Sequence, residues 1–224
     1  MLKLTIACSL VGIALIYLGL TSSGLGQLSA WLGLGFCLTG LGYRKQDARI
    51  YGKQQSGQFP LWSTLLYCPF FLYTLAIWHL VQLLIKENAF DWILPDIVIG
   101  RRLAGKKQPE DIVNYVDLTA EFYEPKHVIE KYHYVSLPIL DGSVPEIDRL
   151  TNAIDSLSPG ITYIHCGQGH GRTGLFTAIL LYRRGEVATL DEALALLKSK
   201  RPKLSLTQQQ RQFVSEFIKR DTSA

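Results

Sequence analysis

The chain has 224 residues, a formal net charge of +4 at pH 7 and hydrophobic residues at 48% of its positions. This length and composition fit one ordinary domain plus a further apolar segment. Its four cysteines stand at positions 8, 37, 68 and 166, and three of them lie in apolar runs. Their spacing excludes a disulfide framework and a zinc-binding motif, so we expect no metal site.

Three long apolar runs precede residue 88, and they are Leu4–Leu20, Leu28–Tyr43 and Leu61–Ile85. A helix needs about 17–25 residues to span a bilayer. We therefore expect residues 1–88 to form a membrane region, with a hairpin of two helices over 4–43 and a third apolar segment over 61–85. A cleaved secretory signal is disfavoured because the first run exceeds the usual 7–15 or so apolar residues and a second run follows closely.

The third segment contains Pro69, so it either spans the membrane with a kink or enters and leaves one leaflet. Basic residues stand on both sides of it, at positions 44–53 and 86–107. The positive-inside rule favours the cytoplasm for both groups, whereas one span between them would separate them. We expect an integral protein of the inner or cell membrane with a cytoplasmic C-terminal domain, and leave open whether 61–85 spans or is re-entrant.

Residues 91–224 have the pattern of an α/β domain. Short β-type runs stand at 97–99, 112–118, 132–137 and 161–165. Three capping boxes indicate helix starts, and they are Ser143 with Glu146, Thr189 with Glu192, and Thr207 with Gln210. We expect a mixed, mostly parallel sheet of about four or five strands, flanked by helices that serve as crossovers.

The apolar run that ends at Cys166 is followed by a glycine-rich loop and then by an apolar helix. The loop residues are Gly167, Gln168, Gly169, His170, Gly171 and Arg172. Glycines let the backbone curl until its N–H groups converge, which makes a cup for an anion. The helix N-terminus and Arg172 favour negative charge on the Cys166 sulfur, so we expect a nucleophilic thiolate. The alternative is an ordinary turn after a small buried cysteine.

His165, Cys166, Arg172 and Thr173 match the active-site signature of the cysteine-dependent phosphatases of the protein-tyrosine and dual-specificity class: His-Cys, five residues, Arg, then Ser or Thr. The resemblance covers roughly residues 91–220 and implies hydrolysis of a phosphate monoester through a phosphocysteine. It also implies a dual-specificity phosphatase-like fold. By this resemblance the loop and Arg172 bind phosphate, and His165 positions the loop. Thr173 either assists departure of the sulfur or is only a helix N-cap.

A phosphate monoester leaves as an alkoxide, so a proton donor is required on the leaving oxygen. Asp141 follows the 132–137 strand, in a Pro-x-x-Asp-Gly context similar to that of the general acid in dual-specificity phosphatases. The alternative is a simple Asp-Gly turn. Gln210 resembles a glutamine that places the hydrolytic water in some relatives, or it is only a cap partner. Asp117 is expected to cap the turn after its strand.

The sequence thus predicts a membrane-anchored phosphatase that needs no cofactor and has no nucleic-acid partner. Its substrate is expected to be a phosphoprotein, at tyrosine, serine or threonine, or a membrane phospholipid phosphate. The loop interior has no lysine to meet a multiply phosphorylated head group, although His170 can add charge at the rim. The alternative is a catalytically weak phosphate-binding adaptor at the membrane. The sequence leaves the oligomeric state open.

Overall fold

The computed structural model describes residues 2–222 and divides them into two compact units. The N-terminal unit contains the chain up to Gln54, Gln58–Lys86 and the short segment Ala120–Tyr123. The α/β unit contains Gln55–Gly57, Glu87–Thr119 and the chain from Glu124 onward.

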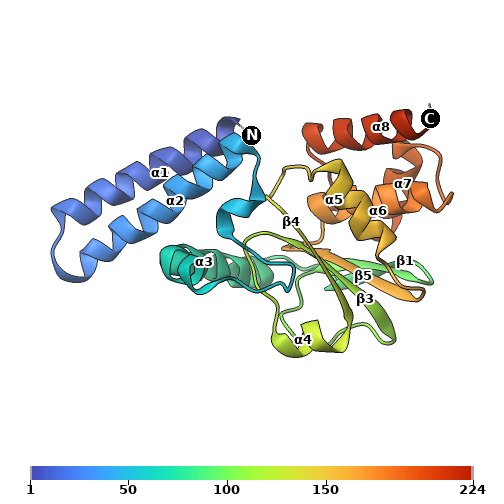
Figure 1. The fold of residues 1–224 in the computed structure, drawn as a ribbon, viewed down its shortest axis with the longest axis horizontal. Helices are drawn as coiled ribbons and strands as arrows, with labels where there is room; N and C mark the ends of the chain where they lie inside the picture. The colour runs from blue at the N-terminus through green and yellow to red at the C-terminus, as the bar shows by residue number, and fades with distance from the viewer. Residues whose placement is uncertain (1, 223–224) are drawn as a thin grey trace. The chain divides into compact units, whose positions relative to one another are not determined.

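The N-terminal unit consists of three long helices and two short 3-10 turns. In order they are α1 (Leu2–Thr21), η1 (Gly24–Gln27), α2 (Leu28–Lys45), η2 (Ala48–Tyr51) and α3 (Leu61–Leu84). Helices α1 and α2 form an antiparallel hairpin (Figure 1). They approach at backbone distance, because a Cβ atom on Gly12 would lie 2.7 Å from the carbonyl oxygen of Gly33. The hairpin expected from the sequence therefore has a glycine-lined seam.

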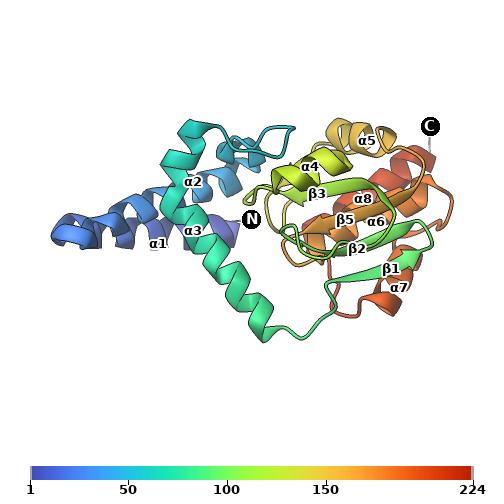
Figure 2. The ribbon, with the colours of Figure 1, turned by 90° about the horizontal axis from the view of Figure 1, so that it is seen from below.

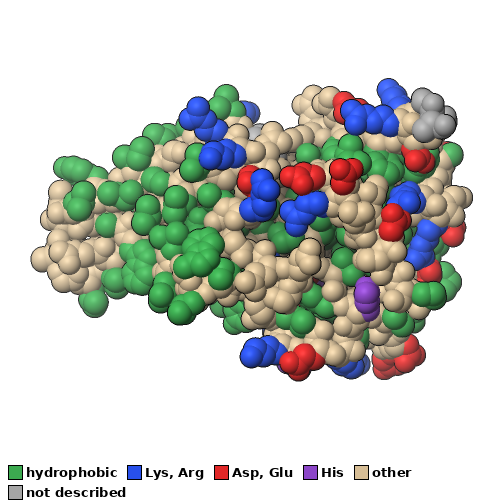
Figure 3. All heavy atoms as spheres, viewed as in Figure 1, with side chains coloured by type: hydrophobic (Ala, Val, Ile, Leu, Met, Phe, Trp, Pro, Cys, Tyr) green, Lys and Arg blue, Asp and Glu red, His purple; other side chains and the backbone are tan. Residues whose placement is uncertain are grey.

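The three helices are long and apolar enough to cross a membrane, by length and composition. Their outward faces are apolar, with Leu10, Ile13, Leu20 and Leu83 among the exposed side chains, and Figure 3 shows this apolar surface. A helix on the surface of a water-soluble domain normally exposes polar side chains. Helix α3 continues through Pro69 without a break, so it contains no turn at which a re-entrant segment could reverse.

The α/β unit is built on one five-stranded sheet with the order β1-β2-β5-β3-β4 (Figure 2). The strands are β1 (Phe90–Leu94), β2 (Ile97–Arg101), β3 (Ile112–Thr119), β4 (His133–Ile139) and β5 (Ile161–Cys166). Strand β1 runs antiparallel to β2, and the other neighbours are parallel. The predicted mixed, mostly parallel sheet is confirmed. Strand β1 was not expected, because its Asp91 interrupts a run too short to show a period of two.

Helices cover both faces of the sheet, and they are α4 (Lys126–Lys131), α5 (Ile147–Asp155), α6 (Gly171–Arg183), α7 (Leu190–Lys200) and α8 (Gln208–Thr222). In Figure 1, α4 lies on one face and α5 to α8 lie on the other. Alternate strand residues enter two different cores: Ile164 and Cys166 pack on the side of α6, whereas Tyr163 packs on the side of Val128 in α4. Cys166 and His165 therefore face opposite sides of the sheet.

Two of the three predicted capping boxes are confirmed. The Glu192 amide donates to Thr189 Oγ1 at 3.2 Å, and the Gln210 amide donates to Thr207 Oγ1 at 3.3 Å. The box of Ser143 with Glu146 is wrong, because α5 begins only at Ile147 and Ser143 makes no cap contact to it. Pro145 disfavours a helical conformation for Val144, and Glu146 is itself extended, so the helix does not begin until Ile147.

Candidate active site

Cys166 is the last residue of β5 and lies at the carboxyl end of three parallel strands. It pairs in register with Arg101 of β2, and the preceding His165 pairs with Asp117 of β3. Ligand sites of open α/β sheets form at this edge. The Cys166 side chain is buried, and its Sγ accepts a hydrogen bond from the Gly169 amide at 3.3 Å.

The carbonyl groups of residues 166–169 are held by donors from outside the loop. The Arg102 amide donates to the carbonyl oxygens of Cys166 at 2.8 Å and Gly167 at 3.3 Å. The Arg201 guanidinium donates to those of Gln168 at 2.9 Å and Gly169 at 2.9 Å. In a trans peptide the next N–H points opposite to the C=O, so the amides of residues 167–170 point away from Arg102 and Arg201, and that of Gly169 donates to Cys166 Sγ. This is the backbone arrangement that an anion cup requires.

Gly169 is the loop position that only glycine fits. Its φ angle is +74°, in the left-handed region, and a Cβ atom there would overlap the backbone carbonyl of Gly100 in β2. The loop thus lies directly on the neighbouring strand. A side chain at Gly169 would have to push the loop and strand apart, which would also move the amide that donates to Cys166 Sγ.

Arg172 lies in the first turn of α6 with its side chain buried. Its Nη1 donates to the carbonyl oxygen of Ile139 at 3.0 Å, and its Nη2 lies 3.3 Å from Asp141 Oδ1. The structure therefore brings Asp141 to Arg172 at the same edge of the sheet, as expected from the sequence. The Asp141 side chain is 74% exposed. It can reach a ligand from the solvent side of the cup.

Thr173 follows Arg172 and is buried. Its Oγ1 has no hydrogen-bond partner among residues 2–222. The residue that caps α6 is His170, so the interpretation of Thr173 as an ordinary N-cap is wrong. A buried hydroxyl left without a partner is costly, so this group calls for a functional explanation.

His165 is buried on the other face of the sheet. Its ring packs against those of Tyr115 and Tyr163, with centroids 4.9 and 5.7 Å away. Its Nδ1 lies 3.4 Å from the carbonyl oxygen of Cys166, and its Nε2 lies 3.8 Å from Asp117 Oδ1. The ring is therefore in contact with the peptide that begins the loop.

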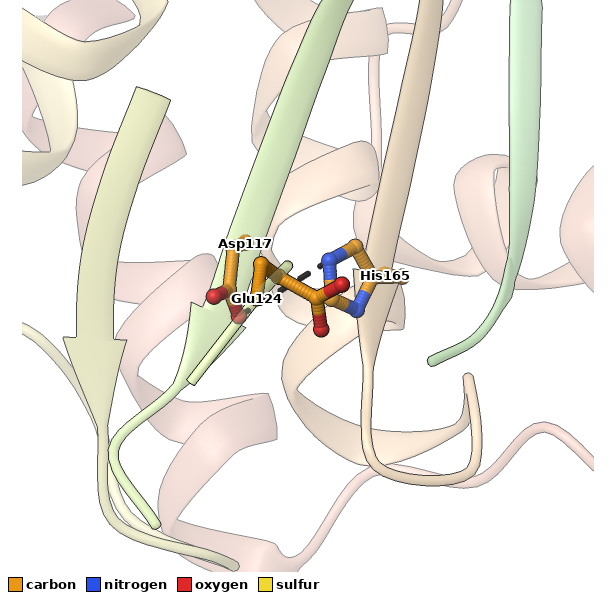
Figure 4. A group of neighbouring side chains, drawn as sticks. All are labelled: Asp117, Glu124 and His165. Carbon is orange, nitrogen blue, oxygen red and sulfur yellow. Dashed lines mark ion pairs between the residues drawn. The ribbon is translucent and has the colours of Figure 1, made fainter. Parts of the chain in front are cut away.

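Asp117, Glu124 and His165 form a buried polar cluster beneath the loop (Figure 4). Their ligand atoms lie within 4.8 Å of one another, close enough to hold a metal ion. The two carboxylates already accept internal hydrogen bonds: Glu124 from Arg102 Nε at 2.7 Å, and Asp117 from Tyr134 Oη at 2.6 Å. We therefore describe the cluster as an internal ion-pair network.

The same network also includes Thr119 and Tyr134. Asp117 Oδ1 accepts from the Thr119 amide at 2.8 Å, so the expected role of Asp117 in capping the turn is confirmed. Burial raises the pKa of Tyr134 well above its usual value, and the Asp117 carboxylate beside it adds to this shift. Tyr134 is consequently a protonated hydrogen-bond donor at neutral pH.

Gln210 is buried at the start of α8. Its Oε1 accepts from the Thr207 amide at 3.0 Å, and its Nε2 donates to the carbonyl oxygen of Ser143 at 3.0 Å. Its role as a cap partner is confirmed, and it also anchors the loop that carries Asp141. Its Oε1 lies beside Gly171, since a Cβ atom at Gly171 would be 2.9 Å away.

Sequence reasoning missed the groups that hold the loop from outside, above all Arg201, Arg102 and Glu124. Arg201 is followed by Pro202, which identified it only as the end of a helix. Charged residues are almost never fully buried unless paired, so an arginine at a helix end is normally assigned to the surface. The partners that bury Arg201 are more than 30 residues away along the chain.

The chain is similar in sequence to known phosphatase domains. Residues 102–216 match the profile of a family described as Swiss Army Knife protein, DSP-PTPase phosphatase domain. Two curated relatives are candidate tyrosine phosphatases of invertebrate iridescent viruses. Protein 197R of virus 6 is 38% identical over 86 residues, which are 33% of this chain and 32% of that protein. Protein 067L of virus 3 is 32% identical over 123 residues, which are 47% and 50% of the two.

Solved structures share the fold of the α/β unit. A mutant form of Tk-PTP superposes with a TM-score of 0.53 and is 25% identical, covering 61% of this chain and 98% of that one. PTPMT1 in complex with PI(5)P superposes with a TM-score of 0.50 and is 17% identical, with the same coverage of 61% and 98%. This chain thus spans almost the full length of both solved structures, but half or less of the length of the two viral relatives.

Proposed function

The chain belongs to the family described as Swiss Army Knife protein, DSP-PTPase phosphatase domain, and on this premise we propose that it hydrolyses phosphate monoesters through a phosphocysteine intermediate. The observation that carries the proposal is the cup itself. The loop carbonyls of residues 166–169 are tied outward, the Gly169 amide donates to Cys166 Sγ, and Arg172 adds positive charge at the helix N-terminus. Such a site binds an oxyanion and activates a thiolate together.

In the first step the Cys166 thiolate attacks phosphorus. An S–P bond forms, the bond from phosphorus to the leaving oxygen breaks, and Asp141 transfers its proton to that oxygen. The amides of residues 167–170 and the guanidinium of Arg172 hold the phosphoryl oxygens, where charge is present in the transition state. Arg172 must exchange part of its contact with Asp141 for the phosphate, which would free the carboxyl for the leaving group.

In the second step a water molecule attacks phosphorus. An O–P bond forms, the S–P bond breaks, and the ionised Asp141 carboxylate accepts the proton of the water. The departing sulfur carries negative charge, and we propose that the buried, unpartnered Thr173 hydroxyl stabilises it as a donor. Inorganic phosphate is released. All groups used are supplied by the chain, so the proposed cycle requires no cofactor.

The test is a phosphate-release assay of the full-length protein with and without vanadate, which competes as an oxyanion. We expect hydrolysis that vanadate inhibits and that Cys166→Ser removes. A single-turnover reaction stopped in acid should trap phosphate on Cys166. Absence of hydrolysis, with oxyanion binding retained, would instead identify a phosphate-binding adaptor.

For the substrate, we propose a membrane phospholipid phosphate or a phosphoprotein. The three apolar helices favour a lipid, because anchoring would confine enzyme and substrate to one surface. The loop interior without lysine favours a singly phosphorylated group, as on a protein side chain. Parallel assays with phosphopeptides and with vesicles containing a lipid monophosphate distinguish the two: the true class should show at least about 10-fold higher kcat/KM, a difference of about 1.4 kcal/mol.

We also propose that the protein is integral to the inner or cell membrane, with residues 1–88 as the membrane region and the catalytic domain over 91–224 in the cytoplasm. The basic residues on both sides of α3 support a cytoplasmic position for its flanks. Protease added to vesicles of known sidedness should cleave the catalytic domain only when the cytoplasmic face is outward. Release of the protein by alkaline carbonate would contradict integral membership.

A further inference from the structure

The segment Glu87–Asp91 contacts His170 of the phosphate-binding loop and also Arg201, the arginine that holds two carbonyl groups of that loop. Asp91 Oδ2 accepts from Arg201 Nη1 at 2.6 Å, and the Asn88 carbonyl oxygen accepts from the same nitrogen at 3.2 Å. Glu87 Oε2 lies 3.0 Å from His170 Nε2, at the far end of the loop. This segment begins three residues after the end of α3 and lies outside the residues 102–216 that match the family.

Arg201 is the link between this segment and the loop. Its side chain is 1% exposed, and its Nε and Nη2 donate to the carbonyl oxygens of Gly169 and Gln168. A guanidinium is planar, so its donors cannot turn independently. The direction in which Nη1 is fixed therefore decides the direction of Nε and Nη2, and with it the orientation of two loop peptides.

Asp91 fixes that direction. Its carboxylate is 14% exposed, and its other oxygen accepts from Asn88 Nδ2 at 2.9 Å, so the acceptor is itself held in place. The orientation of the Gln168 carbonyl sets that of the Gly169 amide, which donates to Cys166 Sγ. A continuous chain of hydrogen bonds thus runs from Asp91 through Arg201 and the loop peptide to the nucleophile.

We propose that Asp91 is a positioning residue of the phosphatase reaction, acting through Arg201 on the amides that bind the phosphoryl group. It touches neither substrate nor sulfur. The inference rests on the proposed function, since it assigns Asp91 to the same site. It assigns a part in the active site to β1, the first strand after α3, outside the family match.

The experiment uses the full-length protein with Asp91→Asn. We expect kcat/KM to fall and the inhibition constant of tungstate to rise, each by about 10- to 100-fold, because misplaced amides bind both substrate and oxyanion poorly. The control is Asp96→Asn, which breaks the exposed ion pair of Asp96 with Arg184, also 2.6 Å long, away from the loop. The control should leave both constants within about twofold.

Two further measurements keep the proposal open to refutation. Arg201→Lys keeps a charge for Asp91 but cannot serve Gln168 and Gly169 together, so it should weaken tungstate to a similar degree even if Asp91→Asn does not fold. Tungstate binding measured by calorimetry in a Cys166→Ser background needs no turnover, so it separates this proposal from the proposed function. A lowered melting temperature with unchanged tungstate affinity and kcat in both variants would overturn the positioning role.

Discussion

Arg172 ends the phosphate-binding loop and Arg201 holds two of its carbonyl groups, and the two arginines are themselves held in different ways. Both side chains are almost fully buried, at 3% and 1% exposure. Arg201 is paired with an Asp91 carboxylate that is 14% exposed, at 2.6 Å. Arg172 meets an Asp141 carboxylate that is 74% exposed, at 3.3 Å. One pair is enclosed and short, and the other is longer and open to solvent.

This difference indicates that the Arg201–Asp91 pair supports the loop, whereas the Arg172–Asp141 pair can rearrange when a ligand binds. An enclosed ion pair with further hydrogen bonds on both partners cannot rearrange without leaving a buried charge unpaired. An open carboxylate can leave its partner and be solvated at little cost. The carbonyl side of the loop is therefore built to stay fixed, while the sulfur side keeps Arg172 and Asp141 available for a ligand. Substitutions on the two sides should consequently have different signatures.

The largest effect is expected from Cys166→Ser on the sulfur side. A serine hydroxyl stays protonated where the thiol ionises, so hydrolysis should fall below detection. The side chains are nearly equal in size, so the thermal unfolding temperature and tungstate binding should be kept. Turnover by this variant above a blank reaction would remove Cys166 as the nucleophile.

The next largest effect is expected for Asp141→Asn, which should lower kcat for an alkyl phosphate about 10²–10⁴-fold. An aryl phosphate with a good leaving group needs less protonation, so the deficit should shrink as the pKa of the leaving group falls. The limb of the pH profile that depends on the protonated acid should flatten. The measurement is kcat across a series of leaving groups.

The controls for Asp141 are Glu146→Gln and Asp148→Asn, two exposed carboxylates a few residues further along the chain. Both should leave the leaving-group dependence of the wild-type protein unchanged. A uniform deficit of Asp141→Asn across all leaving groups would make Asp141 a turn residue, and the control with a graded deficit would then identify the acid.

Arg172→Lys should reduce kcat by about 10²–10³, the usual cost of a lost transition-state donor. The ammonium keeps the charge, but it cannot donate to two phosphoryl oxygens and to the Ile139 carbonyl in the geometry of the planar fork. Arg183→Lys in the same helix is the matched control, because Arg183 pairs with Asp155 at the surface. Equal kinetics of the two lysine variants would show that Arg172 is structural.

The sequence was sufficient to group the residues on the sulfur side of the loop and insufficient for those on the carbonyl side. Cys166, Arg172 and Thr173 are neighbours along the chain, so the roles proposed for them follow from local spacing and from the helix that begins there. Asp141 could be placed because it follows a predicted parallel strand, and all such strands end at one edge. These inferences need only local pattern and topology.

The carbonyl side depends on contacts between distant positions. Arg102 and Glu124 are separated by 22 residues, and Arg201 and Asp91 by 110. Each of these residues is charged and therefore has the sequence character of a surface position. Only the folded chain brings each into contact with an opposite charge. The failed capping box of Ser143 has a local cause instead, since Pro145 keeps the chain extended.

The smallest effect on kcat is expected for Glu124→Gln. This variant also tests the difference between the two sides of the loop most directly. Glu124 is fully buried and accepts from Arg102 Nε at 2.7 Å, while the Arg102 amide holds the carbonyls of Cys166 and Gly167. Removing the charge leaves the Arg102 guanidinium buried without its counterion, which typically costs about 3–5 kcal/mol. Near-ultraviolet circular dichroism should report this as a melting temperature lower by roughly 6–20 °C.

The control is Asp155→Asn, which breaks the exposed pair with Arg183 and should cost less than about 1 kcal/mol. Below its transition Glu124→Gln should keep kcat within about 10-fold, because the Arg102 amide still donates to the loop, and it should show no leaving-group dependence beyond that of the wild-type protein. An unchanged melting temperature combined with a large loss of kcat would contradict this assignment. Glu124 would then take part in the reaction, like the residues on the sulfur side.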